Sequence, residues 1–97
     1  MIYRLHFHEK ALKEFKALDS AVRDRLKRKL AERLHAPHIE ADRLSGQPNR
    51  YKIKLMSPGV RLVYEVVDRK LIVFVLAVDK RERAAAYEKA ASRSYKL

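Results

Sequence analysis

The chain has 97 residues and no cysteine, so it has the length of one domain and excludes disulfide bonds, a thiolate nucleophile and a cysteine-based metal site. Its apolar fraction is 47%, no apolar run approaches the ~20 residues of a membrane span, and the N-terminus has no secretion-signal pattern, so we expect a single cytoplasmic domain over residues 1–97. The net charge of +11 favours a polyanionic partner, either a phosphate backbone or an acidic protein.

The first third of the chain predicts a strand followed by two helices. Residues 2–7 are rich in β-forming side chains and predict a short strand. Residues 9–18 carry apolar side chains at helical spacing with charged residues between them, which predicts an amphipathic helix. Asp19 and Ser20 then suit the start of a second helix, and the two helices are expected to form a hairpin. The apolar face of the second helix consists of Val22, Leu26, Leu30 and Leu34.

The rest of the chain predicts a connector, three strands and a last helix. Proline and glycine break the connector, and the tight turn of a β-hairpin falls at Pro58 and Gly59. An unbroken apolar run rich in β-branched residues is typical of a central strand covered on both faces. The last segment is alanine-rich, with Tyr87, Ala91 and Tyr95 along one stripe. The predicted segments are a connector over 36–50 with a short turn around 39–44, a hairpin over 51–68, a turn near 68–70, a strand over 71–78 and a helix over 84–97.

The hairpin predicts that three cations share one face of the sheet. With a two-residue loop, Arg61 pairs with Met56 and Lys54 pairs with Val63, and cross-strand partners lie on the same face. Because side chains alternate along a strand, Lys52, Lys54 and Arg61 project from one side. The apolar residues between them project from the other side, toward a core.

Two residues that follow the last predicted strand are expected to join these cations. That strand runs back antiparallel and ends near residue 78, so Arg81 emerges at the Arg61 end of the hairpin, and Tyr87 lies within reach of the same corner. A structural interpretation stays open, because outward lysines also protect sheet edges and a tyrosine on an amphipathic helix also packs in a core. Five further basic residues are expected to contact RNA: Arg23, Lys27, Arg28, Arg50 and Arg83. For the helix-surface residues Arg23, Lys27 and Arg28, a solubilising role stays open.

The remaining sequence predicts neither a metal site nor a cofactor. The pairs His6/His8 and His35/His38 have no convincing carboxylate partner and no metal-ligand spacing. The chain also has no Walker loop, dinucleotide fingerprint or nucleophile elbow. An enzyme of this sequence is therefore expected to work without them.

Several segments in a fixed order resemble one known family. They are ALKEFKAL in the first helix, VRDRLKRKLAERL in the second, then IEADRLSGQP, YKIKL, GVRLVYEVVD and VFVLAVDKRER, followed by Tyr87. Together they resemble, over nearly the whole chain, the RelE-family toxins, which are ribosome-dependent mRNA interferases of bacterial toxin–antitoxin pairs. The resemblance implies an α+β fold of β-α-α-β-β-β-α order, with a helical hairpin packed on one face of a small antiparallel-rich sheet and a basic groove on the other.

Carried over position by position, the resemblance implies a catalytic set of Lys52, Lys54, Arg61, Arg81 and Tyr87. The implied reaction is metal-independent attack of an mRNA ribose 2'-hydroxyl on the adjacent phosphate in the ribosomal A site. Arg61 is expected to clamp that phosphate, because its planar fork matches the phosphate oxygens. Lys54 is expected to act as base with Lys52 as its electrostatic partner, because crowded cations disfavour the ammonium form. Arg81 is expected to steady the leaving 5'-oxygen, and Tyr87 to stack on a base.

The resemblance also implies partners: a cognate antitoxin acting near the last helix, the 70S ribosome with its mRNA, and operator DNA bound by the toxin–antitoxin complex mainly through the antitoxin. Because the site has no strong acid–base pair, we expect little cleavage of RNA away from the ribosome. Ser45 and Met56 stand where close relatives often have arginines, which weakens the expected RNA binding. Two alternatives stay open: a toxin of the same fold that poisons DNA gyrase without nuclease activity, and a non-catalytic RNA-binding module.

Overall fold

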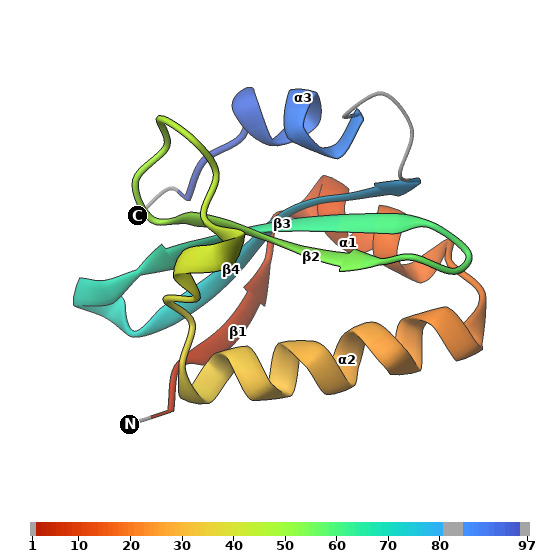
Figure 1. The fold of residues 1–97 in the computed structure, drawn as a ribbon, viewed down its shortest axis with the longest axis horizontal. Helices are drawn as coiled ribbons and strands as arrows, with labels where there is room; N and C mark the ends of the chain where they lie inside the picture. Colours follow the sequence, from red (N-terminus) through yellow and green to blue (C-terminus); the bar gives the residue numbers. More distant parts are fainter. Residues whose placement is uncertain (1, 81–84, 96–97) are drawn as a thin grey trace.

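The computed structural model describes residues 2–80 and 85–95, and its elements follow the predicted β-α-α-β-β-β-α order with two short 3-10 helices added (Figure 1). None of the helices in these described ranges is long and apolar enough to cross a membrane. The elements are β1 (Arg4–Phe7), α1 (Glu9–Lys16), α2 (Ser20–His35), η1 (Glu40–Asp42), β2 (Arg50–Leu55), β3 (Val60–Val67), η2 (Asp68–Lys70), β4 (Ile72–Lys80) and α3 (Ala85–Ala91).

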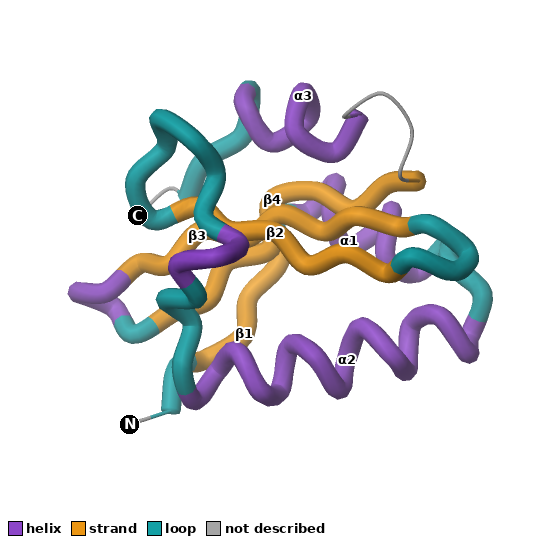
Figure 2. Tube along the Cα trace, in the orientation of Figure 1, coloured by secondary structure: helices purple, strands orange, loops and turns teal. Residues whose placement is uncertain are grey.

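The four strands form one sheet in the order β1-β4-β3-β2. β1 runs parallel to β4, while β3 is antiparallel to both β4 and β2, which confirms the antiparallel-rich sheet of the predicted α+β fold. β4 is a central strand, and residues 72–78 are all buried, as its unbroken apolar run predicts. The sheet crosses the middle of the molecule, with α2 on one side and α3 on the other (Figure 2).

The helical hairpin of α1 and α2 covers one face of the sheet, as predicted. Ala11 and Phe15 of α1 and Leu26 and Leu30 of α2 are buried in one cluster with inward side chains of β2, β3 and β4. Their spacing places them on one stripe of each helix. Burial of these stripes stabilises both helices, and α1, with eight residues, is too short to persist alone in water.

The helix α3 and part of the connector cover the opposite face. Ala86 and Ala90 of α3 pack in a second buried cluster with Leu44 of the connector and with side chains of β3 and β4. A β-bulge in β4 leaves Leu76 without a partner on β3, so Leu76 and Ala77 both belong to this second cluster. Both faces of the sheet are therefore covered, and the α3 side is the one on which the cations of the hairpin lie.

A buried tyrosine connects α2 and the connector to the sheet. The Tyr64 hydroxyl donates to the Pro37 carbonyl at 2.8 Å and accepts a hydrogen bond from Arg33 at 2.8 Å. Arg33 also pairs with Asp42 at 2.7 Å. Burial raises the pKa of Tyr64 above its ordinary value, although the contact with Arg33 opposes this. The hydroxyl therefore stays protonated and keeps its hydrogen bond to the connector.

The hairpin loop is longer than predicted. Residues 56–59 form a four-residue loop, so Arg61 pairs with Lys54 and not with Met56. The physical reason is that Pro-Gly fits poorly into the primed two-residue turns that match strand twist, and Gly59 takes a φ of +93° at the end of the longer loop. Because the register shift is two residues, every side chain keeps its predicted face.

The last helix is shorter than the predicted span of 84–97. It ends at Ala91 within the described residues, and the chain then leaves the helical path. The side chain of Arg50 donates to the carbonyls of Ala90 and Arg93 at 2.9 Å each. Because these carbonyls accept hydrogen bonds from the sheet side, the turn that follows α3 is held against β2 and does not continue as a helix.

Candidate active site

A row of three charged side chains crosses the sheet at the loop end of the hairpin. Lys54 of β2 pairs with Arg61 of β3, and Arg61 pairs with Asp79 of β4, so all three side chains project from one face. Lys52 lies two residues back along β2 on the same face, opposite Val63. The predicted placement of Lys52, Lys54 and Arg61 on one face of the sheet is confirmed. The longer loop brings Lys54 and Arg61 into direct opposition.

The ring of Tyr87 from α3 covers Arg61. The guanidinium carbon of Arg61 lies 5.0 Å from the centroid of the Tyr87 ring, within the range of a cation–π interaction. The Nε atom of Arg61 is buried and has no hydrogen-bond partner among the described residues. A guanidinium has a planar fork of N–H donors that matches two phosphate oxygens, so Arg61 is suited to bind an anionic ligand here.

Asp79 and Lys89 lie at this site but were not among the predicted residues. The Lys89 Nζ atom lies 2.6 Å from Asp79 Oδ2 and 3.2 Å from Glu14 Oε2. Burial alone would raise the pKa of Asp79, but hydrogen bonds from Lys89 and from the Lys80 amide hold that pKa below its ordinary value. An ionised carboxylate therefore stands beside Lys52, Lys54 and Arg61, which we call the basic row. The signal for Asp79 was in the predicted strand order, which places residue 79 beside Arg61.

Two of the predicted RNA-binding arginines are engaged within the chain. Besides its two hydrogen bonds to carbonyls at the end of α3, Arg50 pairs with Glu65 at 3.2 Å, and only 16% of its side chain is exposed. Arg23 donates two hydrogen bonds of 2.9 Å to carbonyls where α1 ends. Both guanidinium groups hold neighbouring backbone in place. Arg50 donates from all three of its nitrogen atoms, which leaves it few N–H groups for a ligand, whereas Arg23 donates through Nη1 alone.

The other predicted residues lie away from the basic row or outside the described residues. Lys27 and Arg28 are exposed on α2, which packs on the face of the sheet opposite α3. Arg81 and Arg83 fall outside the described residues. The residues that the structure brings together are Lys52, Lys54, Arg61 and Tyr87.

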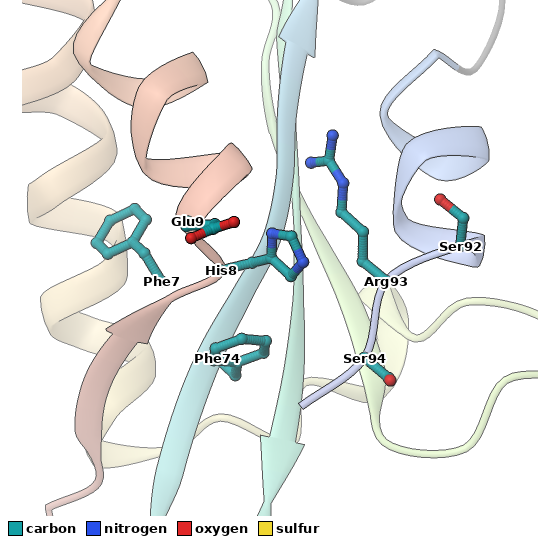
Figure 3. A pocket seen from close by; sticks show the side chains of 7 residues that line it. All are labelled: Phe7, His8, Glu9, Phe74, Ser92, Arg93 and Ser94. Carbon is teal, nitrogen blue, oxygen red and sulfur yellow. The ribbon is translucent and has the colours of Figure 1, made fainter. Parts of the chain in front are cut away.

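A separate hollow of about 400 Å³ lies between the start of α1 and the segment after α3 (Figure 3). Its polar groups already have structural roles, because His8 caps α1 through the Lys10 amide at 3.1 Å and Arg93 binds Glu14. Burial and, next, the charge of Arg93 lower the pKa of His8, which keeps its Nδ1 atom free to accept that capping bond. The hollow is lined by Phe7, His8, Glu9, Phe74, Ser92, Arg93 and Ser94.

The expectation that neither histidine pair has a carboxylate partner is wrong for His38, which the folded connector brings beside Asp68. His38 lies 3.0 Å from Asp68, which also accepts a hydrogen bond of 2.7 Å from the Tyr3 hydroxyl, whereas His8 belongs to the cap of α1. Within residues 2–80 and 85–95, no group of three or more His, Asp and Glu side chains is placed to hold a metal ion.

Comparisons with known proteins identify the family. A family profile described as the ParE toxin of type II toxin-antitoxin system, parDE, matches residues 5–85. The mRNA interferase toxin RelE of Escherichia coli K12 is 55% identical over 93 residues, which cover 96% of this chain and 98% of that protein. The mRNA interferase RelE of Shigella flexneri is similar to the same extent.

Solved structures of relatives have the same fold. The R81A/R83A mutant of E. coli toxin RelE in the free state matches with a TM-score of 0.91 at 52% identity, covering 98% of this chain and 100% of that chain. A chain of the intact E. coli RelBE toxin-antitoxin complex matches with a TM-score of 0.80 at 57% identity, covering 84% of this chain and 99% of that chain. The chain therefore belongs to the RelE family of toxins of type II toxin–antitoxin systems.

Proposed function

We propose that this protein is an mRNA endonuclease toxin that acts in the ribosomal A site and is neutralised by a cognate antitoxin. The observation that carries the proposal is the direct opposition of Lys54 and Arg61 beneath the ring of Tyr87. The 55% identity to an mRNA interferase supports the same reaction class.

In the proposed reaction, the ribose 2'-hydroxyl oxygen attacks the adjacent phosphorus. The O2'–P bond forms while the P–O5' bond breaks, which leaves a 2',3'-cyclic phosphate on one product and a 5'-hydroxyl on the other. Lys54 takes the 2'-hydroxyl proton, and Arg81 steadies the leaving 5'-oxygen until that oxygen takes a proton from water. Arg61 holds the nonbridging oxygens, on which negative charge grows in the transition state.

The assignment of these roles follows the register of the sheet. Of the two lysines on β2, Lys54 lies directly opposite Arg61, so we assign it as the base for a phosphate held by that guanidinium. Lys52 lies farther from the loop end and contributes positive potential to the same face. The Tyr87 ring lies over Arg61, and its role in the proposal is to stack on a base next to the phosphate that Arg61 holds.

We also propose that the reaction needs no metal ion and depends on the ribosome. Fixed cations supply the charge stabilisation for which many nucleases use a metal. The site has no strong acid–base pair, so the alignment of the 2'-hydroxyl with the scissile phosphate must come from the way in which the ribosome holds the mRNA. Purified protein should therefore cleave ribosome-bound mRNA and leave the same RNA in solution largely intact.

An antitoxin that covers the basic row is the proposed means of control. The net charge of +11 favours an acidic partner segment, and one of the solved relatives comes from a RelBE toxin-antitoxin complex. We infer that the antitoxin acts at the Arg61–Tyr87 contact and carries most of the operator DNA binding of the complex. A purified toxin–antitoxin complex that cleaved mRNA at the full rate would contradict this inference.

Primer extension on mRNA programmed into ribosomes tests the proposed function. The wild-type protein should produce cleavage within the codon in the A site, and Lys54→Ala should lower the rate by roughly 10²-fold or more, as expected for loss of a general base. Lys70→Ala is the matched control, because Lys70 is exposed on η2 away from the basic row. Equal cleavage by wild type and Lys54→Ala would remove Lys54 from the mechanism, and absence of cleavage by wild type would overturn the function.

Poisoning of DNA gyrase is the second candidate function, because the matching profile is that of the ParE toxins. The two candidates differ in a supercoiling assay with purified gyrase. We expect supercoiling to proceed unchanged in the presence of the protein. Inhibition of supercoiling without mRNA cleavage would favour the gyrase alternative.

A further inference from the structure

The edge of β4 changes its hydrogen-bond partner halfway along the strand. The adjacent strand β1 pairs with β4 only as far as Val75, where the His8 amide donates the last backbone hydrogen bond at 2.9 Å. Beyond this point two side chains replace the strand. Glu14 accepts a hydrogen bond of 3.0 Å from the Val78 amide, and Arg93 donates one of 2.9 Å to the Leu76 carbonyl.

The same two side chains bind each other around the edge of the sheet. Arg93 donates two hydrogen bonds of 3.0 Å to the two carboxylate oxygens of Glu14, and Lys89 adds its contact of 3.2 Å. We call Glu14, Lys89 and Arg93 the edge clasp. Figure 3 shows the Arg93 side chain extending between α3 and β4. The edge clasp therefore joins α1, on one face of the sheet, to the α3 segment on the other.

The edge clasp matters because α3 has few large apolar side chains that could hold it by packing. The helix has seven residues, which is too short to be stable alone, and its buried side chains are the small ones of Ala86 and Ala90. Burying a methyl group stabilises far less than burying a Leu or Phe side chain. The position of α3 therefore depends strongly on its polar contacts, which are the edge clasp and the two hydrogen bonds from Arg50. Tyr87 lies on this helix one turn before the end.

Glu14 is ionised and deeply placed in these contacts. Its side chain is 18% exposed, and that of Arg93 is 10% exposed. Although burial raises its pKa, hydrogen bonds from Arg93, the Val78 amide and Lys89 hold the pKa of Glu14 below its ordinary value. Charge-assisted pairs of this kind are among the stronger polar contacts of a folded chain.

We propose that Glu14 is a positioning residue of the active site, which acts through Lys89 and Arg93 to hold α3 so that Tyr87 lies over Arg61. Glu14 touches no reacting atom in this inference, and it sits on α1, on the far side of the sheet edge from the basic row. The inference rests on the proposed mRNA cleavage for its kinetic readout. The placement of Tyr87 over Arg61 is also measured independently of activity, through the NMR signal of Arg61.

The test uses the full-length protein with Glu14→Gln, which keeps an acceptor for the Val78 amide but removes the charge that binds Arg93 and Lys89. Glu9→Gln is the matched control, because it removes the same charge from an exposed position on the same helix. On ribosome-programmed mRNA, Glu14→Gln should lower kcat by roughly 10- to 100-fold with KM little changed, the loss expected from a misplaced positioning group. Glu9→Gln should match wild type.

A double-mutant cycle separates positioning from general destabilisation. If Glu14 acts through the tyrosine, Glu14→Gln should add nothing to the loss caused by Tyr87→Ala. An equal fold-loss in both backgrounds would overturn the inference. The second readout is the NMR signal of the Arg61 Nε–H, which the Tyr87 ring shifts in wild type. That signal should move toward its unstacked position in Glu14→Gln and stay unchanged in Glu9→Gln.

The remaining outcomes distinguish failure of the proposed function from failure of the positioning inference. If wild type fails to cleave mRNA, the proposed function fails, and the Arg61 signal alone tests the positioning. If wild type cleaves and Glu14→Gln cleaves equally well with the Arg61 signal unmoved, the inference fails while the function stands. Should Glu14→Gln unfold at the assay temperature, Lys89→Met takes its place, because it opens the edge clasp at a side chain that is 38% exposed. A wild-type Arg61 signal in that variant would contradict the inference.

Discussion

Replacing Arg61 with methionine is expected to stabilise the free protein while abolishing its activity. One feature of the site opposes folding: the buried Nε atom of Arg61 has no hydrogen-bond partner among the described residues. An unsatisfied buried donor costs about 1–3 kcal/mol, whereas the like-charge pair with Lys54 and the opposite-charge pair with Asp79 are each worth about 0.2–1 kcal/mol and offset each other. Methionine removes the unsatisfied donor and fills a similar volume.

The contact with Tyr87 limits this gain. A cation–π contact at a partly exposed site stabilises by about 0.5–1 kcal/mol, and a methionine sulfur against the same ring restores about 0.3–1.5 kcal/mol. These two terms roughly cancel. The free energy of unfolding should therefore rise by about 1–3 kcal/mol, and Tm by about 4–8 °C for each kcal/mol in a domain of this size.

Thermal unfolding followed by circular dichroism measures the effect, with Arg69→Met as control. Arg69 is exposed on η2, so its substitution should change the free energy of unfolding by no more than about 0.5 kcal/mol. The Arg61→Met protein should also lose cleavage of ribosome-bound mRNA. A lower Tm for Arg61→Met would contradict this prediction, because Arg61 would then stabilise the folded protein and not destabilise it.

Three further predictions concern the contacts around the site. In the folded protein the pKa values of Glu14 and Asp79 lie below their ordinary values of 4.5 and 3.8, so as the pH falls the unfolded state binds these protons first. The free energy of unfolding should therefore decrease as the pH drops below the ordinary values, and urea titrations should show a smaller decrease for Glu14→Gln. Tyr64→Phe should lower the free energy of unfolding in urea by about 1–3 kcal/mol, because the Pro37 carbonyl loses its buried donor. An unchanged free energy of unfolding would contradict this prediction. Arg50→Ala should speed amide exchange in α3 while β3 stays protected; unchanged exchange in α3 would show that these carbonyl contacts do not hold the helix.

The faces of the hairpin were predictable from the sequence, whereas its register was not. Alternation along β2 and β3 places Lys52, Lys54 and Arg61 on one side of the sheet, and a register that is shifted by two residues keeps them there. The length of the loop depends on how Pro58 and Gly59 fit the twist of the strands. Pattern alone does not specify that fit, and it decided which residue lies opposite Arg61.

The edge clasp was beyond the reach of sequence patterns. Glu14 looks like any polar residue on the outer side of an amphipathic helix, and its partner Arg93 lies 79 residues away in the chain. Their contact depends on where β1 stops pairing with β4 and on the bulge at Leu76, and an unbroken apolar run shows neither. The end of α3 at Ala91 was equally unpredictable, because it depends on a hydrogen bond from Arg50 on the distant strand β2.

The most direct test of the cleavage chemistry is an mRNA with one 2'-deoxynucleotide at the scissile position, programmed into ribosomes beside the all-ribose mRNA. If cations on one face of the sheet hold the phosphate for attack by the neighbouring hydroxyl, wild-type protein should cut the all-ribose mRNA to a 2',3'-cyclic phosphate and leave the deoxy position uncut. Cleavage of the deoxy position at the ribose rate would contradict the account, because the nucleophile would then have to come from elsewhere.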